Sequence, residues 1–225
     1  KSSTGEWRED FNPFNASRIA NEYCEGNAWQ YTWLVPQDLD LLVERFGGVE
    51  NTLERLDGLF TADTKMEGED VTPDISGLIG QYVHGNEPGH HIIYVYTMLG
   101  EPWKAADRLY EVMATMYSTE PDGLSGNEDV GQMSAWYVMT TLGFYPVEPA
   151  SGKYVLGVPM VDGAEIDVEG GIFRVERAGY SEANRYVQSV ELNGVALDRN
   201  YITHEEVIAG GLLKFNMGAE KSVWY

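Results

Sequence analysis

Apolar positions recur with two different periods along the chain. From about residue 17 to about residue 145 they recur at helical spacing, and Gly and Pro mark the breaks between segments. After about residue 152 the period changes to two, in KYVLGVP, AEIDVEG, IFRVERAG, YVQSVELNG and LLKFNMG. The pattern predicts an α+β fold, with a helical region over residues 1–150 and a β region over residues 151–225.

The helical segments carry start and stop residues at their ends. In PQDLDLLVERFGG, Asp38 is a candidate N-cap and Gly47 a stop, and VENTLERLDGLF follows in the same style. HHIIYVYTMLG predicts a largely buried helix, EPWKAADRLYEVMATMYS places Pro102 in a first turn, and QMSAWYVMTTLGFYPV adds a strongly apolar helix. Short glycine-marked links favour antiparallel helix hairpins, the unit of bundles and of barrels made from helix pairs.

The β region alternates apolar and polar residues, which predicts an antiparallel sheet or sandwich with one face covered. Asn193-Gly194, between VQSVEL and VALD, is a hairpin signal. Since no low-complexity linker separates the two regions, we expect the sheet to pack directly on the helices.

Charge narrows the classes of partner. The chain has 36 acidic and 15 basic residues, a formal charge of -21, which repels nucleic acid and anionic lipid. A neutral substrate, or a divalent cation among carboxylates, suits such a surface. The single cysteine, Cys24, excludes an internal disulfide and a thiolate metal cluster. No apolar run approaches the roughly 20 residues needed to span a bilayer.

Three polar segments interrupt the helical pattern, each at or just before a helix start. We call CEGNAWQY (24–31) the first segment, HGNEPGHH (84–91) the second and GNEDVGQMSAW (126–136) the third. Side chains at such loop ends can point into a common cleft.

In the first segment Glu25 lies beside aromatic residues. Rings that desolvate a carboxyl favour its protonated form, which a general acid needs. Trp29 and Tyr31 offer flat apolar faces that stack on sugars. The alternative is that Glu25 caps a helix and the rings belong to the core.

The second segment holds five side chains able to bind a metal or a sugar: His84, Asn86, Glu87, His90 and His91. The spacing is not the HExxH of zinc proteases, and with an amide and a carboxylate between the histidines calcium is at least as plausible as zinc. The alternative is a helix start that Asn86 caps, with Pro88 in an early turn.

The third segment places Glu128 and Asp129 between Gly126 and Gly131. One of these carboxylates and Glu25 could form the acid and base pair of a glycosidase, although spacing does not assign the roles. The alternative is that the two acids favour the positive end of the following helix.

Together, EGNAWQY, HGNEPGHH, GNEDVGQMSAWYVMTTLGFYPVEPASGKYVLGVP and GGLLKFNMG resemble glycoside hydrolase family 92, the calcium-dependent α-mannosidases, in the family's order. The resemblance implies an exo-acting enzyme that removes terminal, α-1,2-linked mannose from glycans with inversion, calcium helping to bind and distort the sugar. It implies that Glu25 is the general acid and Asp129 the general base, with Asn127 or Glu128 as the partner of the base.

The resemblance also implies a ligand set. Calcium would lie by Glu87 and Asn86, with Asn27 and Gln30 as further candidates. Substrate contacts are expected from five side chains: Trp29, Gln30, Tyr31, His84 and His90.

The resemblance implies a longer enzyme, with an N-terminal β-sandwich and a complete (α/α)6 barrel of six helix hairpins. We therefore expect this chain to be the C-terminal portion, with a partial barrel whose apolar flank pairs with the missing part or with a second copy. The ending KSVWY departs from the family's proline-asparagine ending. Family members are exported, which implies a periplasmic or extracellular location. The alternative functions are a non-catalytic carbohydrate-binding or structural fragment and another helical-barrel glycosidase.

Overall fold

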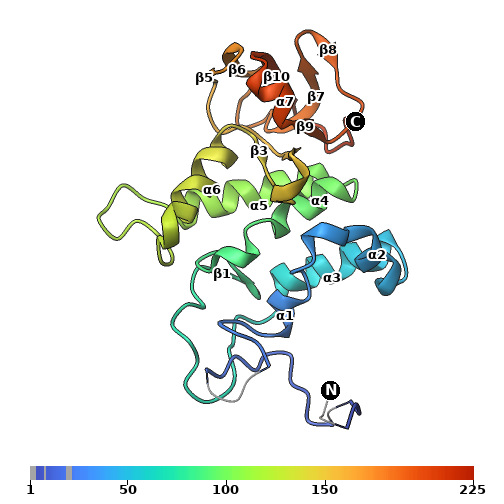
Figure 1. Ribbon diagram of the computed structural model, residues 1–225, viewed down its shortest axis with the longest axis vertical. Helices are drawn as coiled ribbons and strands as arrows, with labels where there is room; N and C mark the ends of the chain where they lie inside the picture. The colour runs from blue at the N-terminus through green and yellow to red at the C-terminus, as the bar shows by residue number, and fades with distance from the viewer. Residues whose placement is uncertain (1–3, 8, 19–21) are drawn as a thin grey trace.

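The computed structural model of the chain describes residues 4–7, 9–18 and 22–225. Strands β5 to β10 gather at one end of its long axis, and the N-terminal segment lies at the other (Figure 1). Helices α4, α5 and α6 lie between them. Among the described residues, no helix combines the length and the apolar character that crossing a bilayer requires.

The helical region begins with short elements. These are α1 (Ala28–Tyr31), η1 (Pro36–Asp38), α2 (Leu39–Phe46) and α3 (Val49–Thr61). The predicted cap is confirmed, because the Asp38 carboxylate accepts a hydrogen bond from the Leu41 amide. Gly47 ends α2 in the left-handed conformation (φ 84°), which glycine adopts without steric cost.

The second half of the region carries the buried helices. Its elements are β1 (Leu78–Ile79), β2 (Tyr82–Val83), η2 (Glu87–Gly89), η3 (Ile92–Tyr94), α4 (Val95–Met98), α5 (Pro102–Thr115), η4 (Asp129–Gly131) and α6 (Gln132–Thr141). The single helix predicted over HHIIYVYTMLG is instead a 3-10 turn running into a short α-helix, although its side chains are buried as predicted.

The strands that follow α6 form two sheets. The elements from β3 onward are β3 (Phe144–Tyr145), η5 (Pro149–Ser151), β4 (Lys153–Leu156), β5 (Gly163–Val168), β6 (Gly171–Ala178), β7 (Tyr186–Leu192), β8 (Val195–Ala196), β9 (Tyr201–Thr203), α7 (His204–Ile208) and β10 (Gly211–Gly218). The strand orders are β5-β6-β10-β7-β8 and β3-β4-β9.

The prediction of an entirely antiparallel sheet is wrong at one pair. Strand β10 enters between β6 and β7, which run in opposite directions, so it is antiparallel to β7 and must be parallel to β6. The predicted hairpin is confirmed: Asn193 and Gly194 have φ of 54° and 80° and join β7 to β8.

The two regions share one hydrophobic core. The rings of Tyr94, in η3, and Tyr145, in β3, stack with centroids 5.3 Å apart. The Tyr110 hydroxyl donates to the Arg185 carbonyl over 3.2 Å. The strands therefore pack directly on the helices, as predicted.

Candidate active site

The three polar segments meet in the folded chain. The side-chain amide of Asn86 donates to the backbone carbonyl of Glu25 over 2.9 Å, which joins the first segment to the second. The backbone of Gly126 lies so close to that of Gly85 that a Cβ built on Gly126 would be 2.1 Å from the Gly85 oxygen. This contact joins the second segment to the third.

A cavity of about 160 Å³ lies where the first two segments meet. Glu25, Gln30 and Tyr31 line it from the first segment, and Asn86 and Pro88 from the second. Its wall therefore combines a carboxylate, two amides and an aromatic ring, the groups that recognise a neutral polyhydroxy ligand.

Glu25 presents its side chain to solvent at this cavity. The residue is exposed, and its carboxylate makes no hydrogen bond or ion pair with another described residue. The N-cap of α1 is Asn27, not Glu25, which removes the capping alternative for Glu25. The Tyr31 ring lines the same cavity as Glu25, whereas Trp29 lines a separate hollow with Phe11 and Arg55.

Asn27 and Gln30 fix the start of α1. The buried Asn27 side chain accepts from the Trp29 amide (2.9 Å) and donates to Gln81 Oε1 (2.8 Å). Gln30 Oε1 accepts from the Asn27 amide over 2.6 Å, completing a capping box. These bonds give both amides a structural role, and contact with calcium or sugar stays a prediction.

The histidines of the second segment are buried beneath it. His84 Nδ1 and Nε2 lie 2.9 and 2.7 Å from the hydroxyls of Tyr82 and Tyr117. His90 Nε2 donates to the His84 carbonyl over 2.9 Å, while Gln132 donates to His90 Nδ1 over 3.2 Å. Both rings support the loop above them, and substrate contact by them stays a prediction.

Burial also keeps these rings neutral. Desolvation lowers the pKa of His84 to about 2 and that of His90 to about 4, because a charged ring at either buried position would lack the hydration that it has in water. Desolvation lowers the pKa of His91 as well, opposed by the bond from Nε2 to the Trp33 carbonyl (2.8 Å). Near neutral pH these rings therefore carry no positive charge beneath the second segment.

Glu87 and Asn86 offer oxygen ligands. Glu87 Oε1 is buried and has no hydrogen-bond partner among the described residues. A buried carboxylate oxygen without a partner is costly, so it calls for a cation or an ordered water. In the described part of the chain no group of three His, Cys, Asp or Glu side chains could hold a metal alone. An ion here would also need amide, carbonyl or water oxygens, the mixed set that calcium accepts.

The two acids of the third segment, Glu128 and Asp129, differ in their hydrogen bonds. Both oxygens of Glu128 accept from the Ser134 amide over 3.2 Å, so Glu128 satisfies the start of α6. Asn127 donates to the Asp74 carboxylate over 3.1 Å. Asp129 is exposed and bonds to no other described side chain. Its carboxylate is therefore the one that a water molecule or a substrate can reach.

Both segments that carry candidate acids hold strained backbone. Glu25 (φ 52°) and Val130 (φ 55°) are left-handed although neither is glycine, which costs about 1–2 kcal/mol per residue. Strain of this kind clusters at functional sites. The sequence did not predict this backbone strain. It also did not predict the hydrogen bond between Asn127 and Asp74, because VTPDISG, which contains Asp74, carries no recognisable signal.

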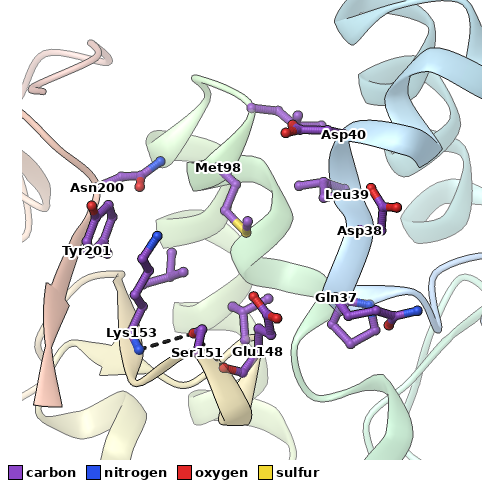
Figure 2. Close-up of a pocket in the computed structure, with 14 residues that line it drawn as sticks. Gln37, Asp38, Leu39, Asp40, Met98, Glu148, Ser151, Lys153, Asn200 and Tyr201 are labelled. Carbon is purple, nitrogen blue, oxygen red and sulfur yellow. Dashed lines mark hydrogen bonds between the residues drawn. The ribbon is translucent and has the colours of Figure 1, made fainter.

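A larger cavity of about 540 Å³ lies between the start of α2 and strands β4 and β9 (Figure 2). Asp40, Glu148, Lys153 and Asn200 line it, and it contains none of the candidate residues. Volume alone does not make a site, so we locate the candidate general acid at the smaller cavity, where the first and second polar segments meet.

Comparison with known proteins identifies the family of the chain. The sequence profile of the glycosyl hydrolase family 92 catalytic domain matches residues 1–219. An uncharacterized secreted glycosidase of Arthroderma benhamiae is 27% identical over 209 residues, covering 91% of this chain and 25% of that protein.

Solved structures give the same result. A family GH92 α-mannosidase from Bacteroides thetaiotaomicron in complex with mannoimidazole superposes with a TM-score of 0.86 and 37% identity, over 97% of this chain and 29% of that one. A GH92 inverting mannosidase from the same organism superposes with a TM-score of 0.79 and 35% identity, over 96% of this chain and 30% of that one. The chain thus spans less than a third of the length of these relatives. Because the family profile matches nearly the whole chain, the chain belongs to glycosyl hydrolase family 92.

Proposed function

We propose that the chain forms the acid and base side of an exo-acting α-mannosidase that removes terminal α-1,2-linked mannose from glycans with inversion. The observation that carries the proposal is the arrangement of two carboxylates that bond to no other described side chain. Glu25 lines a cavity on the first segment, and Asp129 lies on the third, while Asn86 and the Gly85–Gly126 contact tie both to the second.

The two carboxylates would divide the reaction between them. Glu25 would give its proton to the glycosidic oxygen as the bond to the anomeric carbon breaks. Asp129 would take a proton from a water molecule attacking the opposite face of that carbon. Inversion by this route needs the two carboxyl groups roughly 6.5–9.5 Å apart, which leaves room for the water.

Calcium would be held beside Glu25. A bound calcium ion supplies positive charge that attracts sugar hydroxyls. Glu87, through its unpartnered Oε1, and Asn86, through its amide oxygen, would hold the ion. Asn86 would then join the ion to the Glu25 turn, because its amide nitrogen already donates to the Glu25 carbonyl.

The substrate and the location follow the relatives. A neutral mannose-containing glycan suits a chain of formal charge -21, and one relative is described as secreted. We propose an extracellular or periplasmic enzyme in which the rest of a longer protein completes the sugar pocket.

Hydrolysis of an aryl α-mannoside tests the function, with calcium and then a chelator, while NMR follows the anomeric proton of the released mannose. Initial release of β-mannose is expected. Glu25→Gln should lower the rate on a mannobioside by about 10²–10⁴-fold. Glu182→Gln, which alters an exposed glutamate in the β region, is the matched control and should change nothing.

The competing proposal is a carbohydrate-binding portion that performs no chemistry. It is favoured by the exposure of both Glu25 and Asp129, since a working site excludes water. Mannose binding with no release of product from a folded sample would support it against hydrolysis.

A further inference from the structure

The turn that carries Glu25 is held from two sides. On one side, the Tyr31 hydroxyl contacts both backbone polar groups of Cys24: it accepts from the Cys24 amide over 3.0 Å and donates to the Cys24 carbonyl over 2.8 Å. On the other side, Asn86 donates to the Glu25 carbonyl over 2.9 Å. The peptide groups flanking the acid are therefore fixed by side chains.

This restraint acts on a residue that would otherwise leave its conformation. Glu25 has φ 52°, a region that a glutamate in a free loop rarely occupies. Strained conformations persist only where surrounding contacts determine them. The Tyr31 ring also packs close to Gly26, since a Cβ built there would lie 3.1 Å from the ring, so the ring sets the path of the turn as well.

We propose that Tyr31 is a positioning residue, whose hydroxyl, together with the Asn86 amide, holds the Glu25 turn in its left-handed form and directs the carboxylate into the cavity. Glu25 and Tyr31 both line that cavity. The catalytic half of this inference rests on the proposed function, whereas the conformational half does not. Tyr31 thus acts through Glu25 and is distinct from a residue that only stacks on the sugar.

Tyr31→Phe tests the proposal, because it removes both hydrogen bonds to Cys24 and keeps the ring. Tyr137→Phe is the matched control: Tyr137 is 40% exposed and makes no hydrogen bond to another described residue. The first measurement is the backbone chemical shifts of Cys24 and Glu25 in the full chain, which report φ. The shifts should move away from left-handed values in Tyr31→Phe and stay unchanged in Tyr137→Phe.

The second measurement is the dependence of rate on the leaving group. A dinitrophenyl mannoside needs no proton on its leaving oxygen, whereas a mannobioside does. If Tyr31 positions the acid, Tyr31→Phe lowers kcat on the mannobioside, on the order of 10²-fold, and leaves kcat on the dinitrophenyl mannoside unchanged. A merely structural or sugar-stacking role would lower both rates, or raise KM, and would overturn the proposal.

The two measurements separate this proposal from the proposed function. If the unchanged chain cleaves neither substrate, hydrolysis by this chain fails, and the chemical shifts still decide whether Tyr31 holds the turn. Shifts at Cys24 and Glu25 that are the same in Tyr31→Phe as in the unchanged chain overturn the inference whatever the activity.

Discussion

The backbone of Gly126 lies against the backbone of Gly85, so that a Cβ on Gly126 would be 2.1 Å from the Gly85 carbonyl oxygen. Both neighbours in this contact are main chain, which cannot rotate away as a flexible side chain could. Gly126→Ala should therefore push the third segment off the second and cost roughly 1–3 kcal/mol of unfolding free energy.

Chemical denaturation checks this prediction, with Gly163→Ala as its control. A Cβ on Gly163 would meet only the Val175 carbonyl at 3.5 Å, an ordinary contact, and Gly163 is exposed in β5. The control should match the unchanged chain or exceed its stability. Equal midpoints for the two variants would show that the contact between the segments does not stabilise the fold.

The left-handed Val130 predicts a variant with higher stability. Val130 (φ 55°) is fully exposed, so its side chain gains nothing from burial, and asparagine tolerates its conformation better. Val130→Asn should raise the unfolding free energy by about 1 kcal/mol.

The reciprocal substitution provides the control. Asn193 has nearly the same conformation (φ 54°) in the β7–β8 hairpin, and its Oδ1 accepts from the Leu212 amide over 2.8 Å, so Asn193→Val should lower the unfolding free energy by at least as much. Thermal unfolding of both variants measures the pair. Opposite signs are required, and two changes of the same sign would reject the assignment of strain to Val130.

Sequence patterns were sufficient where a single local rule decides the structure. Asp38 caps α2, and Asn193-Gly194 forms the turn that connects β7 to β8, because each signal acts within a few residues. The three polar segments were recognised for the same reason, as dense polar groups at helix starts.

Long-range arrangements could not be predicted in this way. The parallel pairing of β10 with β6 depends on where β10 enters the sheet, more than 30 residues along the chain. Trp29 lines a hollow separate from the Glu25 cavity, together with Phe11 and Arg55, which are distant from it in the sequence. The capping bonds of Asn27 and Glu128 compete with the ligand and catalytic roles expected for them, and composition does not reveal which role a side chain takes.

The buried histidines predict loss of stability in acid. Burial lowers the folded-state pKa of His84, His90 and His91 below the unfolded value of about 6.5, so the unfolded chain binds more protons below that pH. The contribution of these three neutral rings to the unfolding free energy is fully present above about pH 6.5. It is lost as the pH falls toward about 4 for His90, by up to about 1.4 kcal/mol per pH unit for each ring.

Urea unfolding between pH 7 and pH 4 tests this slope. His91→Gln removes one titrating ring while keeping a donor toward the Trp33 carbonyl, so its slope should be smaller. His204→Gln, at the exposed fourth histidine, should keep the full slope. An unchanged slope in His91→Gln would assign the acid sensitivity to other groups.

The unpartnered Glu87 Oε1 predicts that calcium stabilises the chain independently of turnover. Calcium at about 100 times its dissociation constant should raise the unfolding free energy by about 2.7 kcal/mol, and a chelator should reverse the gain. Glu87→Gln should abolish the response, because it removes the charge that binds the ion. Glu148→Gln, in the larger cavity, should respond like the unchanged chain. Thermal unfolding reads the effect without a substrate, so a calcium response that survives Glu87→Gln would move the ion to other ligands even if mannoside hydrolysis required calcium.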